Sequence, residues 1–167
     1  MHRLTPALAL SLLTLAVIPP AIASAADPVL DAEEKVFCKQ VNQYRAQNGR
    51  PALRVSVSLT NASKWMSTDM ATKNYFSHTD SLGRTFSTRL GALGYKYSTP
   101  KGENIAAGNA TGANTFAQWK ASSGHNTTML NSSYKVIGIS RAYNATSMYR
   151  WYWTTDFGGY VDRTIPC

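Results

Sequence analysis

Two histidines and one isolated glutamate are the residues of this sequence best suited to chemistry. His78 and His125 each follow a helix-like segment in polar surroundings, where a side chain can reach a cleft. Glu103 is the only acidic residue in the segment from Lys101 to Gly108. It lies between Gly102 and Gly108, which allow a tight backbone. Imidazole and carboxylate groups are ligands for Zn²⁺ or another divalent cation. A His–Glu pair can also act as a general base with its orienting partner.

The sequence contains no familiar motif of an activated nucleophile. Neither a His-Glu-x-x-His helix nor a Gly-x-Ser-x-Gly elbow is present. Ser132 and Lys135 have the spacing of a Ser–Lys pair, but such a short match of common residues arises by chance and carries no weight. We therefore expect binding or acid–base chemistry at the histidines and not a nucleophilic serine or cysteine.

The N-terminal segment predicts export. Residues 7–18 are almost all apolar, follow a short basic start, and precede the small-residue sequence Ala23-Ser24-Ala25. We interpret residues 1–25 as a signal peptide and residues 26–167 as one secreted, extracellular domain that does not span a membrane. Because an exported protein meets an oxidising environment, Cys38 and Cys167 are expected to form a disulfide.

The net charge of the chain gives only weak information about its binding partners. The chain has a net charge of +8 at pH 7, which favours anionic partners such as cell-wall polymers or phospholipid. Its Lys and Arg residues are not gathered in dense runs with interleaved aromatic residues, so we expect no nucleic-acid partner. Five Asn-x-Ser/Thr sequences would matter only in a eukaryotic secretory pathway, and we interpret them as part of a polar surface.

Helices precede strands along the chain. Apolar spacing and capping signals predict four helices, at residues 31–49, 59–74, 86–93 and 113–121. Residues 97–112 are rich in Gly, Asn and Thr and are expected to form a loop. Residues 136–143 and 149–154 are β-prone runs around a turn-forming segment, which predicts a hairpin. This order favours an α+β fold with an antiparallel sheet.

Five segments together resemble the CAP superfamily, which includes cysteine-rich secretory proteins, antigen 5 and pathogenesis-related proteins. Their order and spacing are most similar to the compact bacterial SCP-domain branch, over about residues 35–158. The segments are Asn42-x-x-Arg45, Tyr75-Phe76-Ser77-His78-Thr79, Gly102-Glu103-Asn104-Ile105-Ala106, Trp119-x-x-Ser122-Ser123-Gly124-His125-Asn126 and Trp153-Thr154-x-x-Phe157-Gly158.

The resemblance implies a three-layer α-β-α sandwich and a cleft lined by two histidines and two acidic residues. Carried over to this sequence, the cleft contains His78, Glu103 and His125. Ser122 stands where many eukaryotic relatives have an acidic residue, so the fourth member is Asp80 or Asp156. Asp80 is preferred for its closeness to His78 in the sequence.

We expect a monomeric extracellular binding protein whose cleft holds a divalent cation, with His78 and His125 as ligands. The ligand class stays open between a cell-wall polymer and a lipid. One alternative is a hydrolase or protease that uses the histidines and Glu103 as acid, base and orienting groups. Another, implied by the resemblance, is lipid or sterol binding by the aromatic residues Tyr149, Trp151, Tyr152 and Trp153, although their alternation is more typical of a sheet core.

Overall fold

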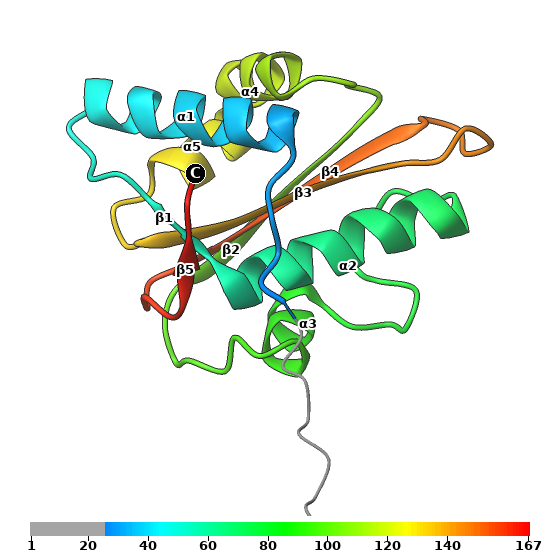
Figure 1. Ribbon diagram of the computed structural model, residues 1–167, viewed down its shortest axis with the longest axis horizontal. Coiled ribbons are helices and arrows are strands. Elements are labelled where there is room, and N and C mark those ends of the chain that lie inside the picture. The colour runs from blue at the N-terminus through cyan, green and yellow to red at the C-terminus, as the bar shows by residue number, and fades with distance from the viewer. Residues whose placement is uncertain (1–25) are drawn as a thin grey trace, which may run out of the picture.

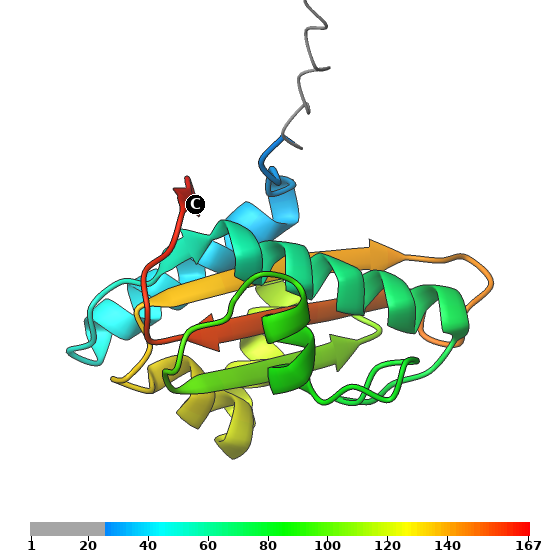
Figure 2. The ribbon, with the colours of Figure 1, turned by 90° about the horizontal axis from the view of Figure 1, so that it is seen from below.

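The computed structural model describes residues 26–167, so the predicted signal peptide at residues 1–25 lies outside the described residues. A five-stranded sheet lies between two layers of helices (Figure 1). One layer contains α1 (Ala32–Gln47), α4 (Gly112–Ala121) and α5 (Ser123–Leu130), and the other contains α2 (Val57–Lys73) and α3 (Phe86–Ala92). Seen from below, α2 and α3 lie in front of the strands (Figure 2). The predicted α-β-α sandwich is confirmed.

Local capping sets the starts of the two long helices. Asp31 accepts a hydrogen bond from the Glu34 amide and Glu34 accepts one from the Asp31 amide, which is the capping box that the sequence predicted before α1. The Ser56 hydroxyl caps α2 through the Leu59 amide, and α2 ends at Asn74 in a left-handed conformation with φ 55°. Both helices therefore begin within two residues of their predicted starts.

The strand order in the sheet is β2-β4-β3-β1-β5. β3 (Val136–Tyr143) and β4 (Trp151–Gly158) pair antiparallel as the predicted hairpin. The short strands β1 (Arg54–Ser56) and β5 (Thr164–Ile165) complete one end, and β1 pairs parallel with β3. The sheet is therefore antiparallel apart from this one pair.

The prediction of a loop at residues 97–112 is wrong for the central part of this segment. Residues Lys101–Ala107 form β2, which pairs antiparallel with β4 from Lys101–Gly158 to Ala107–Tyr152 and places Glu103 opposite Asp156. Small residues give this segment a weak intrinsic strand preference, and the ladder with β4 overrides it. β2 is an edge strand of the sheet, and the candidate site lies beside it.

The second difference from expectation concerns His125. The sequence predicted only that it follows the helix at residues 113–121, but it lies in a further short helix, α5, whose N-cap residue Ser122 makes no side-chain capping hydrogen bond. Contacts from elsewhere in the fold hold α5 in place. The Asn104 side chain donates to the His125 carbonyl at 3.1 Å, and the buried Arg45 guanidinium donates to the Met129 carbonyl at 2.6 Å.

Tight packing joins the helical layers to the sheet. α2 lies so close to β3 that a Cβ atom on Gly138 would come 2.1 Å from the Leu59 carbonyl carbon, which only glycine avoids. On the other face, Phe37 of α1 packs against the buried rings of Trp119 and Trp153. Within residues 26–167, no helix combines the length and the apolar character needed to cross a bilayer.

The predicted disulfide between Cys38 and Cys167 is confirmed. Cys38 lies on the buried face of α1, and Cys167 ends the segment that follows β5. The two residues are 129 positions apart, so the bond fixes the C-terminal segment to the first helix of the described domain.

Candidate functional site

A pocket of about 530 Å³ lies beside β2, where the two helical layers meet. Its polar lining consists of Ser77, His78, Gln118 and His125. His78 comes from the loop between α2 and α3, whereas His125 comes from α5 in the opposite layer. The fold therefore brings together two histidines that are 47 positions apart in the sequence.

His78 is oriented by Glu103. The His78 Nδ1 atom lies 2.7 Å from Glu103 Oε1, and the imidazole is about half exposed while the glutamate side chain is buried. Glu103 Oε2 accepts from the guanidinium of Arg89, which is completely buried. Because an ionised carboxylate accepts and does not donate, the Nδ1–H of His78 donates to Glu103, which leaves Nε2 as the other reactive nitrogen.

His125 is oriented by different partners. Its Nδ1 atom is hydrogen-bonded to the Ser122 hydroxyl at 2.9 Å, and its ring stacks on Trp119 with centroids 5.6 Å apart. Burial, and secondarily the charge of His78, lower the pKa of His125. His125 therefore stays neutral at pH values where an exposed imidazole would begin to protonate. In the tautomer in which Nδ1–H donates to Ser122, the lone pair of Nε2 is free for a ligand.

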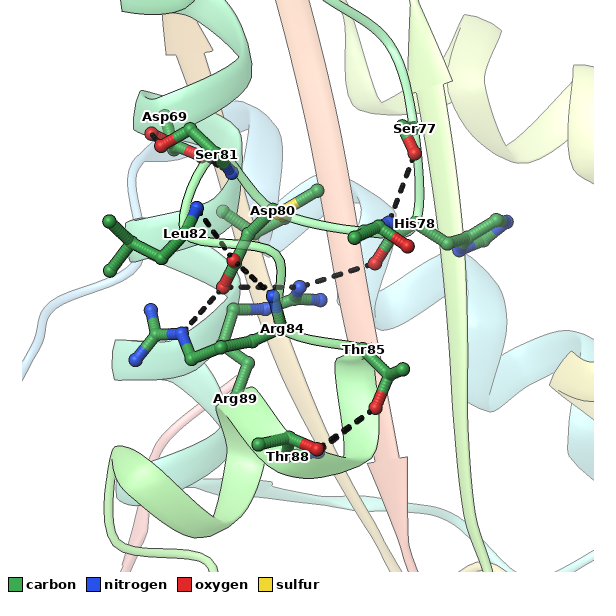
Figure 3. A network of polar contacts seen from close by, with 12 residues as sticks. Asp69, Ser77, His78, Asp80, Ser81, Leu82, Arg84, Thr85, Thr88 and Arg89 are labelled. Carbon is green, nitrogen blue, oxygen red and sulfur yellow. Dashed lines mark hydrogen bonds and ion pairs between the residues drawn. The ribbon is translucent and has the colours of Figure 1, made fainter.

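Asp80 belongs to a neighbouring ion-pair network and does not line the pocket. It accepts hydrogen bonds from the Leu82 and Arg84 amides and from Arg84 Nε, the last at 2.8 Å. Arg89 lies 4.0 Å from Asp80 Oδ2 and also donates to the His78 carbonyl. In Figure 3 the Arg89 guanidinium lies between Asp80 and His78, and the imidazole points away from Asp80.

Asp156, the other candidate for the fourth position, lies behind Glu103 and is completely buried. The Ser63 hydroxyl donates to Asp156 Oδ2 at 2.8 Å, whereas Oδ1 has no hydrogen-bond partner among the described residues. Burial raises the pKa of Asp156 well above its ordinary value, and the nearby charge of Glu103 raises it further, although Arg89 and Ser63 oppose these effects.

An apolar wall completes the pocket. Phe76 and Tyr149 form an edge-to-face pair with ring centroids 6.1 Å apart, and both rings are partly exposed. Of the other aromatic residues considered for lipid binding, Tyr152 and Trp153 are buried and Trp151 is half-buried. Tyr149 is therefore the one residue of that group that lines the pocket.

Two residues of the site were not singled out as functional from the sequence. The family resemblance implies that Ser122 stands where many eukaryotic relatives have an acidic residue, three positions after Trp119, and in the structure Ser122 contacts His125 directly. Arg89 is buried beside Glu103, and nothing in its local sequence distinguishes it from a surface arginine. Its contact with Glu103 forms only when α3 packs against β2 in the folded protein.

The two imidazoles that line the pocket are of a ligand type that divalent cations accept. Each histidine uses Nδ1 for a protein partner, which is the arrangement that orients metal-binding histidines in proteins. Within residues 26–167, no group of three or more His, Cys, Asp or Glu side chains is arranged to hold a metal ion. A cation bound by His78 and His125 would therefore keep coordination positions for water or an oxygen-containing ligand.

Sequence comparison with known proteins identifies a family and a relative of this chain. The model of the CAP family, described as the cysteine-rich secretory protein family, matches residues 39–157. The uncharacterized protein YkwD of Bacillus subtilis (strain 168) is 30% identical over 131 residues, which are 78% of this chain and 48% of the relative. The chain thus spans about half the length of this curated relative.

Solved structures with the same fold come from other bacteria. An extracellular protein containing a SCP domain from Bacillus anthracis has a TM-score of 0.63 and 27% identity, covering 74% of this chain and 39% of its own. An outer surface protein from Borrelia burgdorferi has a TM-score of 0.67 and 18% identity, covering 80% of this chain and 98% of its own. Together with the family match over most of the domain, these likenesses confirm the resemblance seen in the sequence: the chain belongs to the CAP family.

Proposed function

We propose that this protein is secreted and binds an extracellular ligand in the pocket between His78 and His125, with a divalent cation held by the two imidazoles. The observation that carries the proposal is that both histidines line one pocket while each Nδ1 is bonded to its own partner. The solved relatives described as extracellular and outer surface proteins support secretion. The apolar run at residues 7–18 supports it independently.

The pocket favours a ligand with both polar and apolar parts. The imidazoles and the Gln118 amide provide polar groups in the pocket lining, and Phe76, Ile105 and Tyr149 provide apolar surface in the same lining. A bound cation would act as a Lewis acid that polarises a carbonyl or phosphoryl oxygen of the ligand. The protein's own part is to orient the two rings through Glu103 and Ser122 and to present both Nε2 atoms.

The metal part of the proposal predicts a loss of zinc binding in a double variant. We expect the wild-type protein to bind Zn²⁺ and His78→Ala/His125→Ala to bind at least about tenfold more weakly, because both imidazole ligands are removed. Isothermal titration calorimetry with ZnCl₂ measures this. Gln118→Ala is the matched control, since it lines the same pocket without supplying a favoured zinc ligand, and should bind as wild type. Equal affinity in the wild type and the double variant would disprove the cation site.

Hydrolysis is the second candidate function, and the 2.7 Å contact between His78 and Glu103 favours it. In this candidate, His78 Nε2 takes a proton from water while Glu103 accepts the Nδ1–H and stabilises the charged ring. Turnover of peptide, ester or cell-wall substrates is expected to fall about 10²–10⁴-fold in Glu103→Gln, with little loss in Asp69→Asn, whose carboxylate binds Tyr75 and Ser81 instead. Undiminished turnover in folded Glu103→Gln would reject this role for Glu103.

A further inference from the structure

The buried carboxyl group of Asp156 has no part in the pocket lining, yet it lies next to the residue that orients His78. Asp156 and Glu103 occupy opposite positions on β4 and β2. The groups that face Asp156 are Glu103 from β2, Arg89 from α3 and Ser63 from α2, while Gly138 of β3 contributes no side chain. The polar surroundings of Asp156 therefore include one acid, one guanidinium group and one hydroxyl.

The charges in this region do not balance if every acid is ionised and His78 is neutral. Three buried carboxyl groups, of Asp80, Glu103 and Asp156, face the two guanidinium groups of Arg84 and Arg89, while the half-exposed imidazole of His78 contacts Glu103 and is charged only when protonated. An unpaired buried charge is costly, and a buried acid usually takes up a proton instead. One of the three carboxyl groups is therefore expected to be neutral.

The hydrogen bonds single out Asp156 as the neutral member. Arg89 donates to Glu103 and to the His78 carbonyl, and none of its nitrogens is hydrogen-bonded to Asp156. Asp80 accepts three hydrogen bonds from the Arg84 segment. Asp156 receives only the Ser63 hydroxyl, and its Oδ1 is buried without a partner among the described residues. A proton on Oδ1 would turn this orphaned acceptor into a donor with the Glu103 carboxylate beside it.

We propose that Asp156 is a positioning residue that keeps a proton at neutral pH and donates a hydrogen bond to Glu103, holding that carboxylate against His78. Glu103 then receives three donors, from Arg89, Asp156 and His78. With both of its oxygens engaged, the glutamate is fixed in one orientation, and the His78 ring is held with Nδ1–H toward Glu103 and Nε2 toward the pocket. The inference deepens the proposed function, because the orientation of His78 matters for ligand or cation binding.

NMR of metal-free protein labelled with ¹³C at the aspartate carboxyl groups tests this proposal directly. The sequence contains six aspartates, so the carboxyl resonances can be assigned by single substitutions. We expect one resonance to remain at the position of a protonated acid at about pH 7 and to be absent from Asp156→Asn, since burial and Glu103 both oppose ionisation. In Glu103→Gln the pKa of Asp156 should fall, because a neighbouring negative charge is gone and Arg89 becomes free to pair.

The tautomer of His78, read from its ¹⁵N shifts in the same metal-free protein, separates positioning from mere packing. Asp156→Asn retains a neutral donor and should keep the Nδ1–H form, whereas Asp156→Ala should give a mixture of tautomers. Ionised Asp156 at about pH 7 in the wild type would overturn the proposal, as would an unchanged His78 tautomer in folded Asp156→Ala. Neither measurement requires zinc, so failure of the cation site would leave this test intact.

Discussion

Arg89→Met is expected to destabilise the protein by about 3–5 kcal/mol, because it leaves the buried Glu103 carboxylate without its guanidinium partner. The Arg89 side chain is fully buried, as are those of its partners Glu103 and Asp80. Methionine fills much of the space but provides no donor for Glu103. Urea unfolding followed by circular dichroism at about pH 7 measures the loss of unfolding free energy.

A matched surface variant identifies the cause of that loss. Arg163→Met is the matched control, because Arg163 forms an ion pair with Asp27 but two thirds of its side chain is exposed; we expect a loss of less than about 1 kcal/mol. A similarly small loss in Arg89→Met would contradict a role for Arg89 in charge compensation.

Removal of the disulfide is expected to have the second large effect, a loss of about 2–5 kcal/mol. Cys38 and Cys167 are 129 positions apart, and the chain-entropy model assigns about 4–5 kcal/mol to closing a loop of that length. The double variant Cys38→Ala/Cys167→Ser avoids a stray thiol. Its urea midpoint should lie well below that of the oxidised wild type.

Reduction provides the control for the disulfide variant. Dithiothreitol should lower the unfolding midpoint of the wild type and leave that of Cys38→Ala/Cys167→Ser unchanged, since the variant has no bond to reduce. If reduced wild type and oxidised wild type unfold at the same denaturant concentration, the bond does not stabilise the fold by constraining the unfolded chain.

Most helices of the fold were predictable, because their signals are local. The Asp31–Glu34 capping box and the apolar spacing after it define α1 without reference to the rest of the chain. β2 and α5 were missed because their stability is not local: β2 depends on its ladder with β4, and α5 depends on donors from Asn104 and Arg45. A short stretch of sequence contains no information about either of these long-range contacts.

The candidate site, too, was predictable where its signals are local in the sequence and not where they depend on the assembled fold. The sequence named His78, Glu103 and His125 through motifs, and the structure places the two histidines in one pocket with Glu103 behind His78. The positions of Asp80 and Asp156 could not be separated from spacing alone. Cross-strand register decides that Asp156 lies next to Glu103, and register is a property of the assembled sheet.

β2 is the edge strand of the sheet, and this position determines how the pocket is built. In the part of the chain that the structure describes, no strand lies beyond β2 to separate the helical layers, so His78 from one layer and His125 from the other approach the same space. The distance between the two imidazoles therefore depends on how closely the two helical layers approach each other at this edge. Any ligand that engages both rings connects one layer to the other, and it stabilises the sandwich by an amount that grows with the ratio of ligand concentration to Kd.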